Sequence, residues 1–104
     1  MSGVQVAGLN DLLDFYKNLT IFTGELKKSA GERNYLGMAE ALLGVARLVH
    51  KNPEIIEEIP DVAEDLRRRL RLCAKIFERN GKVGKKFTCL RLGRWLDSKN
   101  KSDK

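Results

Sequence analysis

The sequence predicts an all-α fold, a small bundle of three to four amphipathic helices with a basic C-terminal helix and a disordered tail. Apolar residues recur at helical spacing in several separate stretches, and capping and breaker residues divide these stretches from one another. The length of 104 residues and the 42% hydrophobic composition suit one small globular domain, predicted over residues 1–98.

The first helix is expected over residues 10–22 and the second from residue 29 onward. Gly24 is the expected stop of the first helix, and Ser29-Ala-Gly-Glu32 has the form of a capping box that opens the second. Small residues on the second helix, at Gly37, Ala41 and Gly44, predict that another helix approaches closely there. The apolar stripes are Leu9, Leu12, Leu13, Tyr16 and Leu19 on the first helix, and Tyr35, Met38, Ala39, Leu42, Val45, Ala46 and Val49 on the second.

The third helix is expected from residue 61 to residue 79, after a short turn that Asn52-Pro53 opens and Pro60 ends. Asp61-Val-Ala-Glu64 resembles a second capping box. One face is apolar, with Val62, Ala63, Leu66, Leu70, Cys73, Ala74 and Phe77, and the opposite face carries Arg67, Arg68, Arg71, Lys75 and Arg79.

The fourth helix is expected over residues 85–98, after the breaker pair Asn80-Gly81. Its apolar residues fall on two sides, so it is predicted to pack against the domain and still present a face outward. Residues 99–104 are expected to form a disordered basic tail.

The charge is divided unevenly along the chain. Residues 1–66 hold 6 Lys/Arg and 11 Asp/Glu, whereas residues 67–104 hold 14 Lys/Arg and 3 Asp/Glu. The formal charge of +6 therefore combines a charge of −5 over residues 1–66 with a charge of +11 over residues 67–104. A basic segment of this strength predicts an anionic partner, either nucleic acid or an anionic membrane surface.

Enzymatic function is not expected, and neither is a catalytic residue, a cofactor, a metal or a small-molecule substrate. His50 is interpreted as a cap at the end of a helix, Cys73 as core filler, and Cys89 as a thiol in a basic setting that could lower its pKa. The sequence has no phosphate-binding glycine loop and no zinc-ligand spacing. A signal peptide and a membrane-spanning stretch are not found, so an intracellular location is expected.

The cationic surfaces are therefore the candidate sites. For the fourth helix we expect lipid-binding cations at Lys82, Lys85, Lys86, Arg91 and Arg94, and membrane-inserting residues at Phe87, Leu90, Leu92, Trp95 and Leu96. For the third helix the alternative is phosphate binding by Arg67, Arg68, Arg71, Lys75 and Arg79.

Two stretches together resemble the N-terminal half of the peroxin-11 family of membrane-remodelling proteins. The first is Ser29-Ala-Gly-Glu-Arg33 with the following helix, and the second is Leu90-Arg-Leu-Gly-Arg-Trp-Leu-Asp97, which is similar to that family's membrane-inserting amphipathic helix. The order Glu32-Arg33 inverts the family's basic-acidic order. The resemblance implies binding and remodelling of anionic membranes, with organelle proliferation, at a peroxisomal or glycosomal surface; without it a cytoplasmic location is expected.

Three functions follow as hypotheses. The first is binding of an anionic membrane surface by the basic amphipathic helix, with membrane remodelling. The alternative is a small helical nucleic-acid-binding protein that recognises a duplex backbone and forms a dimer. The third is a helical adaptor that binds other proteins or a second copy of itself through its helices.

Overall fold

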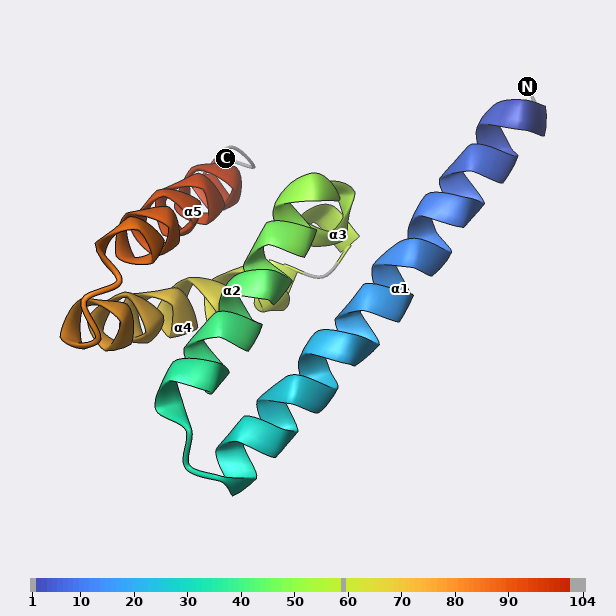
Figure 1. Ribbon diagram of the computed structural model, residues 1–104. Helices are drawn as coiled ribbons and strands as arrows, with labels where there is room; N and C mark the ends of the chain where they lie inside the picture. Colours follow the sequence, from blue (N-terminus) through green and yellow to red (C-terminus); the bar gives the residue numbers. More distant parts are fainter. Residues whose placement is uncertain (1, 59, 102–104) are drawn as a thin grey trace.

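The computed structural model describes the backbone of residues 2–58 and 60–101, and the side chains of residues 13–54, 56, 57 and 60–99. Five helices follow one another and no strand occurs among these residues, which confirms the all-α prediction. Four long helices form a bundle, and the short α3 links its two halves (Figure 1). The helices are α1 (Ser2–Gly31), α2 (Tyr35–Lys51), α3 (Glu54–Glu58), α4 (Pro60–Arg79) and α5 (Val83–Lys101).

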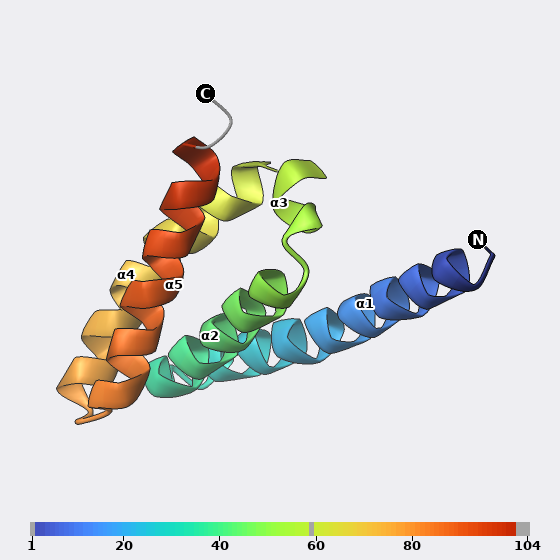
Figure 2. The same cartoon turned by 90° about the horizontal axis from the view of Figure 1, so that it is seen from above.

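The bundle consists of two antiparallel pairs. α1 packs against α2, α4 packs against α5, and α2 joins the pairs by packing on α4. At about 1.5 Å per residue, the 30 residues of α1 span about 45 Å, whereas the 17 residues of α2 span about 26 Å. The N-terminal part of α1 consequently extends beyond the rest of the bundle (Figure 2).

The prediction that the first helix stops at Gly24 is wrong, because α1 continues through this residue to Gly31. An exposed glycine in a helix interior costs about 1 kcal/mol relative to alanine, which packing against a neighbouring helix can override. The predicted apolar stripe is wrong at Leu13 and Tyr16, which are exposed, and Phe15 is buried instead. Leu9 and Leu12 of that stripe lie outside the residues whose side chains the structure describes. The face of α1 that is withdrawn from solvent carries Phe15, Leu19, Phe22 and Leu26.

The predicted capping box at Ser29 and Glu32 is wrong as a helix start. Ser29 lies in the last turn of α1, where its carbonyl oxygen accepts a hydrogen bond from the Asn34 N–H at 2.8 Å, and the Arg33 N–H donates to the Ala30 carbonyl at 3.1 Å. These two bonds form a Schellman motif with Arg33 in the left-handed region at φ 55°. α2 begins after Asn34, whose Oδ1 accepts from the Gly37 N–H at 3.0 Å.

The breaker pair Asn80-Gly81 ends α4 as predicted. The Lys82 N–H donates to the Phe77 carbonyl at 2.8 Å and the Gly81 N–H donates to the Glu78 carbonyl at 3.1 Å, which is a second Schellman motif. Gly81 supplies the positive φ of 72° that this motif requires. α5 begins at Val83 and reaches Lys101, so residues 99–101 are helical, and the rest of the predicted tail, residues 102–104, lies outside the described residues.

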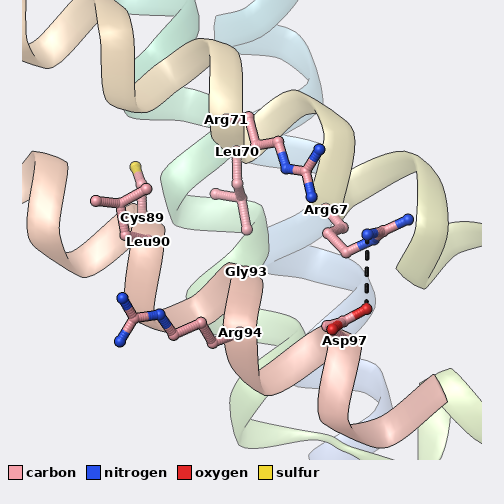
Figure 3. A pocket seen from close by; sticks show the side chains of 8 residues that line it. All are labelled: Arg67, Leu70, Arg71, Cys89, Leu90, Gly93, Arg94 and Asp97. Carbon is pink, nitrogen blue, oxygen red and sulfur yellow. Dashed lines mark ion pairs between the residues drawn. The ribbon is translucent and has the colours of Figure 1, made fainter. Parts of the chain in front are cut away.

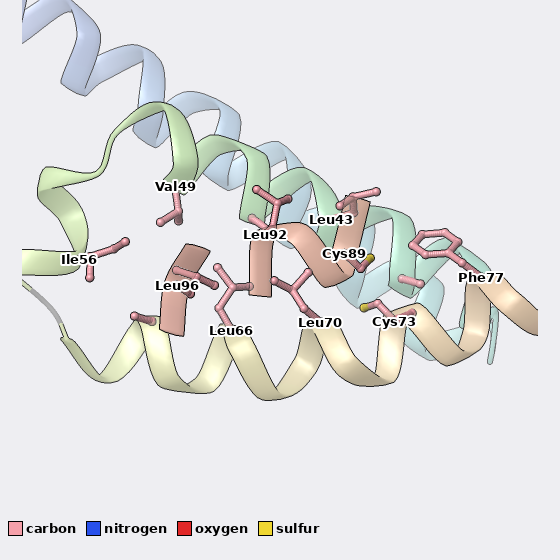
Figure 4. Packing of buried hydrophobic residues seen from close by; sticks show 14 residues of the cluster. Leu43, Val49, Ile56, Leu66, Leu70, Cys73, Phe77, Cys89, Leu92 and Leu96 are labelled. Atoms are coloured by element: carbon pink, nitrogen blue, oxygen red, sulfur yellow. The ribbon is translucent and has the colours of Figure 1, made fainter. Parts of the chain in front are cut away.

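The hydrophobic core lies where α2, α4 and α5 meet (Figure 4). The predicted apolar face of the third helix is buried except at its first residue, Val62, which is 36% exposed. Tyr35, the first residue of the stripe predicted on the second helix, is also exposed. The largest fully buried side chains are Phe77, Leu70, Leu96, Val49, Cys73 and Cys89.

Candidate anion-binding site

The side chains of two antiparallel helices line a cationic groove between α4 and α5. Arg67, Arg71 and Lys75 follow one another at intervals of four residues, so they form a stripe along α4 beside its buried face. On α5, Leu90, Arg94 and Asp97 likewise lie within one stripe. The pairing of the two helices brings these stripes to opposite sides of a pocket of about 170 Å³ (Figure 3).

Three adjoining hollows share Leu90 and extend this groove into a continuous surface. Their walls contain six Lys or Arg side chains and two acidic ones, Glu78 and Asp97. We call this surface the α4–α5 face, and its defining residues are Arg67, Arg71, Lys75, Lys86, Phe87, Leu90, Arg91 and Arg94.

Two of the six cations are paired with an acid. Arg67 Nη1 lies 3.5 Å from Asp97 Oδ1, and Lys86 Nζ pairs with Glu78 Oε2. The hydrogen bond from Lys86 lowers the pKa of the Glu78 carboxyl, and the charge of Lys86 lowers it further. The other four, Arg71, Lys75, Arg91 and Arg94, form no ion pair with any residue that the structure describes. The face therefore carries a positive charge that its own acids do not neutralise.

The Arg67 side chain is incompletely satisfied. Its Nε is buried and donates to no acceptor in the structure, although its Nη1 faces Asp97 (Figure 3). A buried donor without an acceptor costs about 1–3 kcal/mol.

An exposed aromatic ring lies beside the cations. Phe87 is 60% exposed, and Val83, one turn earlier on α5, is 53% exposed. The Lys86 Nζ lies 5.6 Å from the centre of the Phe87 ring. Apolar and cationic side chains thus share one surface, as they do on helices that bind at the headgroup level of a membrane.

The structure divides the ten lipid-binding residues predicted on the fourth helix. Lys86, Phe87, Leu90, Arg91 and Arg94 lie on the α4–α5 face, and Lys82 is exposed at the turn that precedes α5. Lys85 lies elsewhere, because its Nζ pairs with Glu40 of α2 at 3.2 Å.

The other apolar residues predicted to insert are part of the bundle. Leu92 is 5% exposed and Leu96 is 1% exposed, so both belong to the core. Trp95 is half-buried, and its ring lies edge-on to that of His50 at 4.6 Å between centres. In the folded bundle, insertion at a membrane is therefore open to Phe87 and Leu90 but not to Leu92 or Leu96.

The alternative phosphate-binding set is divided in the same way. Arg67, Arg71 and Lys75 lie on the α4–α5 face, whereas Arg68 pairs with Glu64 at 3.1 Å and Arg79 is exposed at the end of α4. Five of the ten lipid-binding residues and three of the five phosphate-binding residues thus meet on one surface. Sequence reasoning missed the acids of this surface, although the spacing of Asp97 three residues after Arg94 places both on one side of a helix.

The prediction that a basic setting lowers the pKa of Cys89 is wrong. Burial raises the pKa of Cys89 to about 11, and the opposing effect of the Arg47 charge is smaller. Burial also raises the pKa of Cys73 to about 12, and the nearby Cys89 adds to this shift. Cys73 is core filler as predicted, and Cys89 joins it in the core from α5.

His50 lies in the last turn of α2, where a positive charge suits the helix dipole. The capping residue is Asn52, whose backbone N–H donates to the Val49 carbonyl at 3.0 Å. Among the described residues, no three His, Cys, Asp or Glu side chains are grouped as they would be around a metal ion.

The described helices include none with the length and apolar character needed to cross a bilayer. Comparisons with protein-family models, with curated proteins and with solved structures found no match. The resemblance to the peroxin-11 family stays a prediction.

Proposed function

We propose that this protein binds anionic membrane surfaces through the α4–α5 face. The observation that carries the proposal is the position of Phe87, which is 60% exposed within a face that holds six cations against two acids. The cations would lie at the lipid headgroups, and Phe87 with Val83 would enter the boundary between headgroups and acyl chains.

Two contributions to the binding free energy can be estimated. A Lys or Arg near an anionic leaflet contributes about 1 kcal/mol, so the four cations without an ion pair would supply about 4 kcal/mol. Transfer of a phenylalanine side chain from water supplies about 1.5–3 kcal/mol when it is complete. The sum of about 5.5–7 kcal/mol corresponds to a dissociation constant between about 100 μM and 10 μM, which is reversible surface binding.

The proposal is for docking of the folded bundle. A deeper wedge that includes Leu92 and Leu96 requires α5 to leave the core, because these residues are 5% and 1% exposed. Membrane remodelling of the peroxin-11 type would therefore depend on many docked copies or on an opening of the α4–α5 pair.

The exposed apolar residues favour a membrane over nucleic acid. A duplex backbone offers phosphates to Arg71, Lys75 and Arg94, but it offers no apolar phase to Phe87 and Val83. Nucleic acid is thus the competing outcome in the experiment below.

Co-sedimentation with phosphatidylcholine vesicles, with and without phosphatidylglycerol, tests the proposal at low and high salt. The triple variant Arg71→Gln/Arg91→Gln/Arg94→Gln should bind anionic vesicles about 100-fold more weakly than the native chain, since three cations of about 1 kcal/mol each are lost. The matched control is Lys17→Gln/Lys27→Gln/Arg69→Gln, which loses the same charge from exposed positions outside the α4–α5 face.

Equal losses in the two triple variants would show that net charge, and not this face, determines binding. Equal affinity for neutral and anionic vesicles would refute the proposal outright. A gel shift of duplex RNA or DNA at lower protein concentration than vesicle binding requires would assign the face to nucleic acid instead.

A further inference from the structure

The arginines that line the pocket between α4 and α5 have more hydrogen-bond donors than the protein has acceptors for them there. A guanidinium has five N–H donors. At Arg67 the buried Nε donates to no acceptor, and the 3.5 Å from Nη1 to Asp97 Oδ1 exceeds the usual 2.7–2.9 Å of a charge-assisted hydrogen bond. Arg71, one turn further along α4, extends its guanidinium toward Arg67 on the same side of the pocket (Figure 3).

We propose that this pocket binds the phosphate monoester headgroup of an anionic lipid. Arg67 and Arg71 donate to the phosphate oxygens from α4, whereas the Arg94 side chain on α5 lines the pocket but extends away from this pair (Figure 3). The inference rests on the proposed membrane function and names the headgroup class that the α4–α5 face recognises.

The charge of the phosphate and its number of terminal oxygens favour a phosphate monoester over a diester. A phosphate monoester carries a charge of about −1.5 to −2 at pH 7 and has three terminal oxygens. A diester carries one negative charge and has two terminal oxygens. Two adjacent guanidinium groups present planar pairs of donors, which bind phosphate oxygens in a bidentate manner. The two guanidinium groups of Arg67 and Arg71 therefore match the additional oxygen and charge of the monoester.

The dimensions of the pocket agree with this ligand. A volume of about 170 Å³ corresponds to several water molecules of about 30 Å³ each, which is room for a phosphate group. Leu70, Leu90 and Gly93 form the apolar part of its wall. Because Leu90 and Arg94 also border the hollow that contains Phe87, a bound headgroup lies next to the ring proposed to enter the membrane.

Asp97 competes with the headgroup for Arg67. Its carboxylate occupies one side of the Arg67 guanidinium, so a dianionic phosphate must approach against its charge. The substitution Asp97→Asn should therefore increase the affinity for a monoester lipid. The gain in affinity should be larger for monoester lipids than for diester lipids, which distinguishes binding in the pocket from general electrostatic attraction. Removal of a negative charge from an exposed position outside the pocket would not show this dependence on the headgroup.

The test compares phosphatidylcholine vesicles that contain phosphatidic acid with vesicles that contain phosphatidylglycerol, adjusted to equal zeta potential. The native chain should bind the phosphatidic acid vesicles about tenfold more tightly. Arg71→Gln should abolish this preference, and Arg69→Gln, which removes the same charge from outside the pocket, should retain it. Both substitutions are at exposed positions, and circular dichroism should show both variants folded.

Equal binding to both kinds of anionic vesicle would refute the pocket while leaving the membrane function intact. Absence of any preference for anionic over neutral vesicles would refute the membrane function itself. Soluble glycerol 3-phosphate should displace the native chain from phosphatidic acid vesicles only at concentrations far above that of the lipid. Displacement at concentrations comparable to the lipid would assign the pocket to a soluble phosphate ester and overturn the lipid assignment.

Discussion

The Phe22 ring of α1 occupies the space that a Cβ at Gly44 of α2 would need. A Cβ built on Gly44 lies against Phe22 Cε1, 2.7 Å from Phe22 Cδ1 and 2.8 Å from Phe22 Cζ. The ring therefore packs directly on the backbone of α2. This contact confirms that a small residue at Gly44 permits the close approach of another helix.

Gly44→Ala should destabilise the protein by about 1–3 kcal/mol, because the Phe22 ring has to move away from α2. Gly24→Ala is the matched control, since a Cβ there meets nothing within 4 Å. It should stabilise α1 by up to about 1 kcal/mol through helix propensity. Urea unfolding measures both changes, and a stabilising Gly44→Ala would contradict the packing described.

Arg33→Gly should stabilise the protein by about 1 kcal/mol. Arg33 adopts φ 55° at the end of α1, and a left-handed backbone costs a residue with a Cβ about 1–2 kcal/mol. Gly81→Ala should have the opposite effect, because Gly81 holds the equivalent position at the end of α4 with φ 72°. Thermal unfolding of the two variants measures this, and a lower midpoint for Arg33→Gly would disprove it.

Leu96→Ala and Phe87→Ala should separate stability from binding on one helix. Leu96 is 1% exposed, so its truncation should cost about 2–5 kcal/mol of folding free energy. Phe87 is 60% exposed, so Phe87→Ala should change stability by less than about 0.5 kcal/mol. Only Phe87→Ala should weaken vesicle binding of the folded protein. Unchanged vesicle affinity in Phe87→Ala would exclude this ring from the membrane contact.

The thiols should react slowly in the folded protein. Burial raises the pKa of Cys73 to about 12 and that of Cys89 to about 11, and only a thiolate attacks a disulfide reagent. At pH 8, labelling by a coloured aromatic disulfide should be far slower than in guanidinium chloride, where both thiols are exposed. Fast labelling of the native chain at pH 8 would show that α4 and α5 separate readily.

The same thiols predict a loss of stability in alkali. The reference thiol pKa is 9.0, so above pH 9 the unfolded chain loses protons that the folded chain retains until about pH 11–12. The free energy of unfolding should consequently fall as pH rises from 9 toward 11. Urea unfolding at several pH values measures this. The free energy of unfolding should fall less steeply with pH in Cys73→Ala than in the native chain, and an equal fall would assign the pH dependence to other groups.

The sequence was sufficient to predict α4 and its buried face, because the apolar stripe repeats without interruption and a glycine follows the helix. Leu66, Leu70, Cys73 and Phe77 are all buried as predicted. The boundary between α1 and α2 was not predictable from capping patterns alone. Ser29 and Glu32 fit a helix start, but they lie at a helix end, and the cap is Asn34.

The candidate site was likewise predictable from the sequence only in part. Periodicity found the cations of α4 and α5 separately, but their meeting depends on how the two helices pair. The core role of Leu92 and Leu96 also follows from that pairing, since apolar residues on two sides of a helix leave open which side is buried. The buried Nε of Arg67 is a property of packing and has no sequence signal.

The turn at Gly81 sets the rotation of α5 about its own axis. Each helical residue advances the direction of the side chains by about 100°. One inserted residue between Asn80 and Lys82 would therefore rotate α5 by about a quarter of a turn, bringing Arg91 toward the place of Leu92 in the core. The length of the three-residue turn between α4 and α5 thus decides which side of α5 is buried in the protein and which side is exposed to a ligand.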